Sequence, residues 1–167
     1  MPPAQPASQP PAQPAARTPH EVLEHYHRAL VSMSADDLAD LYAPDATHEF
    51  PFPFPGMPNC YKGREQVRAG FRAAWQHSPA TPAGLRDVTV HPTADATVLI
   101  AEQTVTGTVA TTGEPFAFPG ILVLHVEDGR ITHVRDYMDA LTITRTLRRD
   151  PGPGPASAQA ERSGMNR

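Results

Sequence analysis

The second half of the chain alternates apolar and polar residues with the period of β-strands, and its clearest unit is a hairpin over residues 120–138. Two β-rich runs flank Asp128-Gly129. Asp-Gly in this setting is a strong hairpin signal, because glycine tolerates the positive φ of a tight turn. Successive side chains of a strand point to opposite faces, so Asp136 is expected to share a face with Met138 and other apolar residues. A lone carboxylate on an apolar face makes Asp136 the first candidate functional residue.

Apolar residues in the first half of the chain follow the spacing of helices. Residues 18–21, Thr-Pro-His-Glu, are typical of a helix start: threonine caps the amino end, proline fits the first turn and glutamate completes a capping box. A short second helix is predicted from Ser34, with Leu41 and Tyr42 on its buried side. A third helix is predicted after Gly63.

Strands follow the third helix. They are predicted over 85–91, 97–109, 114–126 and 131–138, with a last helix over 140–149. An earlier strand, 46–50, precedes a proline-rich loop. Helices followed by antiparallel strands imply an α+β fold, in which a curved antiparallel sheet packed against three N-terminal helices forms a cone with an open end. Such a concave apolar space is a usual small-ligand site, and the aromatic loop 50–57 would lie at its mouth.

Composition divides the 167 residues into three parts. Residues 1–17 are almost entirely proline, alanine, glutamine and serine, and residues 150–167 are similar. Because such segments have little to bury, we expect a disordered arm and a disordered tail. The remaining residues, 18–149, are long enough for one domain with a core of its own.

Charge and cysteine content narrow the classes of partner. The net charge is −4 and no basic stripe is visible, so we expect no nucleic acid partner. The single cysteine, Cys60, allows no internal disulfide, and the eight histidines form no ligand pair, so we expect no metal and no cofactor. No apolar run approaches the ~20 residues of a membrane span and no secretory signal is visible, so a cytoplasmic location is expected.

Two segments carry a resemblance to a known family. They are YAPDATHEFPFPFPGMPNCYKGREQVRAGF at 42–71 and GILVLHVEDGRITHVRDYMD at 120–139. Together they resemble the nuclear transport factor 2-like superfamily in its SnoaL-like, polyketide-cyclase-like branch, over about residues 18–149. The resemblance implies a cone-shaped barrel of the cystatin type and a homodimer formed through the exposed sheet face. Because the superfamily includes isomerases, cyclases, epoxide hydrolases, dehydratases and binders, the fold does not choose the function.

Comparison with two branches of the superfamily excludes their chemistry. Ketosteroid isomerases carry a phenol where this chain has Tyr26, but their base would fall on Phe50 and their oxyanion-hole acid near Leu122. Neither residue can exchange a proton, so a steroid-type allylic isomerase is not expected.

The machinery of limonene-epoxide-hydrolase-like proteins is also incomplete. One of their carboxylates corresponds to Asp136, but the arginine and its partner would fall on Val105 and Gly107. Proteins of phenazine assembly carry a carboxylate at the position of Asp136, where the resemblance implies acid or base catalysis.

Three residues are the candidate catalytic groups. Burial in an apolar cavity would let Asp136 act as acid or base near neutral pH, although a carboxylate paired with arginine would look the same in sequence. Glu49 lies on the strand face that the resemblance directs inward, and could divide the acid and base roles with Asp136; the alternative is a charge at the cavity rim. Tyr26 could donate a hydrogen bond to a substrate oxygen, or be an ordinary core tyrosine. His48 is more typical of a packing residue.

Apolar and aromatic residues are expected to form the wall and lid of the cavity, and their flat faces suit a planar or polycyclic substrate. The candidate substrate-binding residues are Phe50, Phe52, Phe54, Met57, Trp75, Gln103, Val105, Leu122 and Met138.

Two functions remain open. The first is a cofactor-independent isomerase, cyclase or dehydratase that acts by acid/base catalysis on a small apolar oxygenated metabolite, of the kind found in secondary metabolism. The second is a non-catalytic small-molecule-binding or dimerisation module with the same fold. The positions of Asp136 and Glu49 discriminate them: both must reach one cavity for the two-carboxylate enzyme, whereas either one facing solvent favours binding.

Overall fold

A computed structural model describes residues 16–148, so the predicted disordered arm and tail lie almost entirely outside the described residues. The elements in chain order are α1 (Pro19–Val31), α2 (Ala35–Ala39), β1 (Tyr42–Glu49), β2 (Cys60–Lys62), α3 (Arg64–Gln76), β3 (Ala80–Pro92), β4 (Val98–Val109), β5 (Pro115–Glu127), β6 (Arg130–Met138) and α4 (Ala140–Leu147). Within this range, no helix has the length and apolar character needed to span a membrane.

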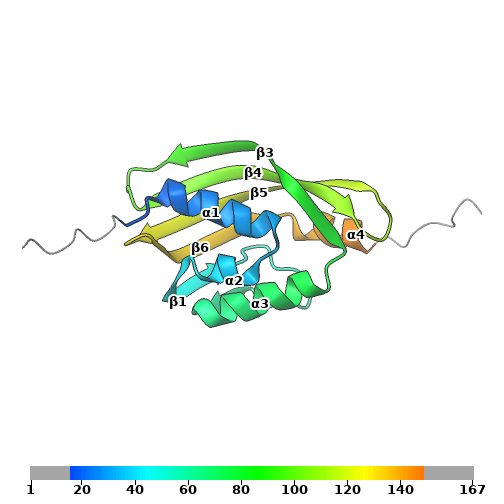
Figure 1. The fold of residues 1–167 in the computed structure, drawn as a ribbon, viewed down its shortest axis with the longest axis horizontal. Coiled ribbons are helices and arrows are strands. Elements are labelled where there is room, and N and C mark those ends of the chain that lie inside the picture. Colours follow the sequence, from blue (N-terminus) through cyan, green and yellow to red (C-terminus); the bar gives the residue numbers. More distant parts are fainter. Residues whose placement is uncertain (1–15, 149–167) are drawn as a thin grey trace, which may run out of the picture.

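The strands form one six-stranded sheet in the order β2-β1-β6-β5-β4-β3. Neighbouring strands are antiparallel except β1 and β6, which are parallel. The predicted α+β architecture is therefore confirmed, with the correction that the sheet is mixed. Figure 1 shows the long, curved strands β3, β4 and β5 with α1 lying across them, and α3 at the other side of the molecule near β1.

The helix starts follow from their capping residues. At the start of α1 the Thr18 amide donates to Glu21 Oε2 at 2.7 Å, and the Glu21 amide donates to Thr18 Oγ1 at 3.3 Å, so the predicted capping box is present. The Ser34 side chain caps α2. The core beneath the helices contains fully buried Leu23 and Leu38 together with sheet residues such as Leu124.

The β5–β6 hairpin turns where the sequence predicts. Asp128 and Gly129 both have positive φ, 49° and 73°, as a two-residue turn of this kind requires. One extra residue in β6 between the partners of His125 and Val126 forms a bulge just beyond the turn. After the bulge the alternation is regular, and it brings Asp136 to the helix-covered face.

Several predicted boundaries were wrong. The second helix ends at Ala39, and Tyr42, which was placed on that helix, begins β1. The strand start at Tyr42 is four residues before the predicted one, because Pro44 and Asp45, which were expected to end the helix, lie within the extended chain of β1. β3 begins at Ala80 because its first residues pair with the end of β4. The short strand β2 was not predicted.

Candidate active site

The predicted cavity exists beneath the helices. It has a volume of about 570 Å³ and lies between α1, α3, the loop after β1, strands β4 to β6 and α4. Of the three candidate catalytic residues, Tyr26 and Asp136 line it. Six of the nine candidate substrate-binding residues also line it: Phe50, Phe54, Met57, Trp75, Val105 and Met138.

Asp136 supplies a carboxylate to this apolar space. It lies on β6 and is only 5% exposed. Met138, two residues later, also lines the cavity, so the two residues share a face as the alternation predicts. Within the described residues no side chain makes an arginine or lysine ion pair with Asp136; the titratable side chain beside it is a histidine.

That neighbour is His48, which lies on β1 beside Asp136. Its Nε2 is 3.7 Å from Asp136 Oδ2, and the ring is fully buried. The parallel pairing of β1 with β6 sets His48 opposite Val134, close to Asp136 in space although 88 positions separate them in sequence. His48 was interpreted as a packing residue, and its contact with Asp136 was missed. The signal was its position between Ala46 and Phe50, which marks the buried face of the strand.

Tyr42 contacts the other nitrogen of the His48 imidazole. The Tyr42 hydroxyl lies 2.7 Å from His48 Nδ1. Burial, followed by the charge of Asp136, raises the pKa of Tyr42 well above its usual value, so the phenol keeps its proton. When that proton is donated to Nδ1, the neutral imidazole carries its own proton on Nε2, toward Asp136.

Tyr26 reaches the cavity from α1. Its hydroxyl is fully buried beside Tyr42 and makes no hydrogen bond of good geometry with any described residue. Burial, then the neighbouring Tyr42 and Asp136, raise the pKa of Tyr26 well above its usual value. The result is a protonated phenol without a good partner, which can donate to an oxygen atom in the cavity.

Glu49 lies on the opposite face of the sheet, and the expectation that it faces inward was wrong. It does not line the cavity; its Oε2 lies 3.2 Å from Arg135 Nε and 3.3 Å from His133 Nε2. Although desolvation acts the other way, the hydrogen bonds and charges of these two residues lower the pKa of Glu49. The cause is register: β1 pairs Glu49 with Arg135, whose side chain alternates with that of Asp136.

The cavity wall is more aromatic than predicted. Phe71 on α3 contacts the rings of His48 and Trp75, at centroid distances of 5.1 and 5.0 Å. Phe116 and Phe118 on β5 stack at 4.4 Å and complete the far wall. None of these three residues was assigned to the cavity from the sequence; Phe71 was predicted only on the apolar side of the third helix. Flat walls of this kind suit a planar ligand.

Three of the predicted substrate-binding residues lie elsewhere. Phe52 is 63% exposed and packs on Tyr137 outside the cavity. Gln103 faces the helices, but its Oε1 lies 2.6 Å from His27 Nε2 and it does not line the cavity. Leu122 is fully enclosed in the core. Burial patterns alone do not distinguish a cavity wall from a filled core, which is why these assignments failed.

Residues 16–148 contain no group of three or more histidine, cysteine or acidic side chains arranged to hold a metal ion. The ionisable side chains that line the cavity are those of Tyr26, Tyr61, His77, Asp136 and Arg148. Of these, Asp136 lies against His48 and Tyr26 lies beside Tyr42.

Helices packed on one face of a curved, mostly antiparallel sheet, with a cavity between, define the nuclear transport factor 2-like class. A protein of this class from Burkholderia pseudomallei shares the fold, with a TM-score of 0.59 at 18% identity over 78% of this chain and 97% of that protein. Residues 23–134 match the SnoaL-like domain, and the chain belongs to this family.

Three other proteins are similar to this chain in sequence or in structure. An uncharacterized PhzA/B-like protein of Pseudomonas aeruginosa is 32% identical over 121 residues, which cover 72% of this chain and 84% of that protein. A provisionally named isomerase from Bacillus subtilis has a TM-score of 0.68 at 25% identity, over 76% of this chain and 90% of its own. A provisionally named polyketide cyclase from Pseudomonas putida has a TM-score of 0.62 at 19% identity, over 79% of this chain and 99% of its own, which shows the shared fold.

Proposed function

We propose that this protein is an acid/base enzyme that removes a proton from a carbon next to a carbonyl group in a planar, apolar, oxygenated small molecule. The observation that carries the proposal is that Asp136 and Tyr26 line one aromatic cavity, where the Tyr26 hydroxyl makes no hydrogen bond of good geometry with a described residue. The names of the Bacillus subtilis and Pseudomonas relatives, as isomerase and PhzA/B-like protein, support this class of chemistry.

The proposed reaction begins with the substrate packed between the aromatic walls. The Asp136 carboxylate takes the proton from carbon, the carbon–hydrogen electron pair moves into the carbon–carbon bond, and the carbonyl oxygen becomes an enolate oxygen. Tyr26 donates a hydrogen bond to that oxygen and stabilises its developing charge. Asp136 then returns the proton in one of three ways. It goes to another carbon in isomerisation, to the oxygen of a second carbonyl that the enolate carbon has attacked in cyclisation, or to a hydroxyl group that leaves as water in dehydration.

His48 is a positioning residue in this proposal, because it contacts Asp136 but does not line the cavity. Its Nε2 lies behind the carboxylate at 3.7 Å, and the Tyr42 hydroxyl, 2.7 Å from Nδ1, holds the orientation of the imidazole. This arrangement takes over the supporting role for which Glu49 was a candidate. Asp136, Tyr26 and His48 thus come from β6, α1 and β1, elements that only the folded chain brings together.

A non-catalytic binding module is the second candidate, and the outward position of Glu49 favours it. The two-carboxylate enzyme required both acids in one cavity, and only Asp136 is there. We give precedence to the enzyme because Asp136 lies against a second titratable side chain, His48, which is buried behind the cavity wall.

Deuterium exchange separates the two candidates. All three proposed reactions begin by breaking a carbon–hydrogen bond next to a carbonyl, so the enzyme should speed exchange of those hydrogens in a bicyclic aromatic ketone such as β-tetralone in D₂O. Asp136→Asn should lower the exchange rate at least about 100-fold, the usual contribution of a general base. Glu49→Gln is the matched control and should change the rate by less than about twofold, the effect of a surface charge.

The outcomes of this assay are distinct. If the wild type binds the ketone without accelerating exchange, the protein is a binding module. If Asp136→Asn exchanges as fast as the wild type, Asp136 is not the base.

We also propose a homodimer formed through the exposed sheet face, as the family resemblance implies. Phe52, Ile121 and Leu141 are 63%, 41% and 56% exposed and lie together beside Tyr137. An apolar patch of this kind is typical of an interface. Analytical ultracentrifugation should give a dimer at micromolar concentration, and a monomer would contradict the proposal.

A further inference from the structure

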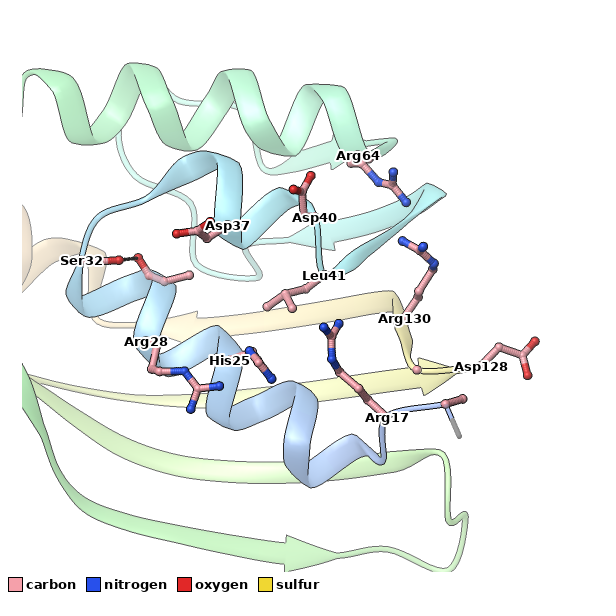
Figure 2. Close-up of a pocket in the computed structure, with 13 residues that line it drawn as sticks. Arg17, His25, Arg28, Ser32, Asp37, Asp40, Leu41, Arg64, Asp128 and Arg130 are labelled. Carbon is pink, nitrogen blue, oxygen red and sulfur yellow. Dashed lines mark hydrogen bonds between the residues drawn. The ribbon is translucent and has the colours of Figure 1, made fainter. Parts of the chain in front are cut away.

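A second pocket, which we call the arginine pocket, lies beside the β5–β6 turn (Figure 2). It has a volume of about 1100 Å³ and is formed where the residues before α1, the second half of α1, helix α2, the start of α3 and the β5–β6 turn meet. Among the described residues it shares no lining residue with the aromatic cavity. Its presence is not explained by the proposed function.

Four arginines line this pocket, and they come from separate parts of the chain. Arg17 precedes α1, Arg28 lies within α1, Arg64 begins α3 and Arg130 begins β6. Figure 2 shows the guanidinium groups of Arg17, Arg64 and Arg130 around the same space, with Leu41 at its base. Arg64 is anchored there, because its Nε donates to the Tyr42 carbonyl at 2.8 Å.

None of these four arginines forms an ion pair with a carboxylate within residues 16–148. Arginines nearby behave differently: Arg68 binds Asp36 at 2.7 Å and Asp40 at 2.9 Å, and Arg72 binds Asp36 at 2.6 Å. Arg17, Arg28 and Arg130 are exposed to solvent, and Glu21 lies close enough to Arg17 for the two charges to interact. The four guanidinium groups still concentrate positive charge at one hollow of a chain whose net charge is −4. A bound anion would gain favourable charge contacts there.

Three aspartates also line the arginine pocket, and they do not cancel its charge. Asp40 is already paired with Arg68, outside the pocket. Asp128 points away from the arginines in Figure 2, and Asp37 lies on α2, on the far side from Arg64 and Arg130.

His25, which also lines the arginine pocket, responds to this positive potential. Burial, and then the charges of Arg28 and Arg17, lower its pKa, although Glu24 and Glu21 act in the opposite direction. An anion in the pocket would offset the two arginines and raise the pKa of His25. The pKa of His25 therefore reports whether an anion occupies the arginine pocket.

The number and spread of the arginines indicate the chemistry of the anion. One guanidinium satisfies one carboxylate through two parallel hydrogen bonds, whereas a phosphate has several oxygens that accept from different directions. Four arginines from four parts of the chain, around a space much larger than one phosphate, match an anion with more than one phosphoryl group. Leu41 and Ala29 add an apolar surface for an organic part. We propose that the arginine pocket binds a small organic diphosphate.

Calorimetry with inorganic pyrophosphate on the full chain tests this proposal. Wild-type protein should bind it saturably at low salt, with affinity that falls as salt rises. The double variant Arg17→Gln/Arg130→Gln should bind at least about tenfold more weakly, because it removes two charge-assisted contacts. The matched control is Arg86→Gln/Arg145→Gln, which removes the same charge outside the pocket and should bind as the wild type does.

Two further measurements identify the site and the ligand class. In NMR titrations pyrophosphate should raise the pKa of His25 in the wild type but not in Arg17→Gln/Arg130→Gln. Citrate, a polycarboxylate of similar charge, should bind more weakly than pyrophosphate. The proposal is overturned by an absence of saturable pyrophosphate binding up to about 10 mM, by equal weakening in both double variants, by an unchanged His25 pKa, or by tighter binding of citrate.

Discussion

His48 Nε2 lies 3.7 Å from Asp136 Oδ2, and both side chains are buried, at 0% and 5% exposure. The distance is longer than a hydrogen bond and short enough for strong electrostatic contact at low dielectric. Because Tyr42 binds the opposite side of the ring, the imidazole has little freedom to turn away from the carboxylate. A small shift of either group therefore decides whether the two side chains form a hydrogen bond.

Tyr42→Phe should disturb this contact without altering the cavity wall. Loss of the hydroxyl leaves buried His48 Nδ1 without its partner, which should lower the free energy of unfolding by about 1–3 kcal/mol. A misplaced imidazole should slow ketone exchange by roughly tenfold or more and shift its pH dependence. Tyr137→Phe, on the outer face, is the control. An exchange rate and pH profile equal to those of the wild type would show that His48 has only a packing role.

The second prediction concerns Glu49 and the pH dependence of the free energy of unfolding. Its pKa is lower in the folded than in the unfolded state, so its stabilising effect is complete above the unfolded value and disappears as the pH falls through the folded value. Its side chain is 38% exposed, so solvent screening keeps the effect below about 1 kcal/mol.

Urea unfolding of Glu49→Gln measures this contribution. The variant should be slightly less stable than the wild type above about pH 5 and equally stable near about pH 3. Glu127→Gln, at the end of β5, should follow the wild type throughout. A deficit for Glu49→Gln that grows at low pH would contradict the outward ion-pair assignment.

Two phenylalanines of the same loop should behave differently in ligand binding. Phe54 lines the aromatic cavity, whereas Phe52 is largely exposed outside it. Phe54→Ala should weaken binding of β-tetralone roughly tenfold, through lost apolar contact, and Phe52→Ala should not change it. Trp75, the only tryptophan, lines the same cavity, so its fluorescence reports the binding. Equal loss in both variants would mean that the ligand lies at the loop surface.

Gly107 links sheet packing to the cavity wall. A Cβ atom at this position would collide with the Thr81 carbonyl and lie 2.7 Å from Phe116 Cζ. Gly107→Ala should therefore lower the free energy of unfolding by about 1–3 kcal/mol, as overpacking does. Gly84→Ala, on the neighbouring strand, meets no atom within 4 Å and is the control in thermal unfolding. A neutral Gly107→Ala would mean that β3 and β4 separate easily.

The fold and the position of Asp136 on the covered face were predictable because they depend on local periodicity. The Asp128-Gly129 turn determines the hairpin, and alternation beyond the bulge, over residues 134–138, places Asp136 on the covered face. The contact between His48 and Asp136 depends instead on which strand lies beside β6 and on the direction of that strand. The parallel pairing of β1 with β6 joins segments that are far apart in the sequence, so local sequence patterns do not predict it.

The wrong prediction that Glu49 faces the cavity also arose because local patterns do not determine how β1 packs. Thr47 and Glu49 share one face of β1, and His48 lies on the other. Either face could be turned toward the helices, and the family resemblance suggested the face of Glu49, which was wrong. The flanking residues Ala46 and Phe50 carried the correct information, because both are apolar and share the parity of His48.

A crystal structure of Asp136→Asn with β-tetralone is the most direct test of the central claim, that the aromatic cavity is the substrate site. We predict density for the bicyclic rings between Trp75 and Val105, with the ketone oxygen within hydrogen-bond distance of the Tyr26 hydroxyl. A ligand bound on the outer patch of Phe52, Ile121 and Leu141, with the cavity empty, would contradict the account.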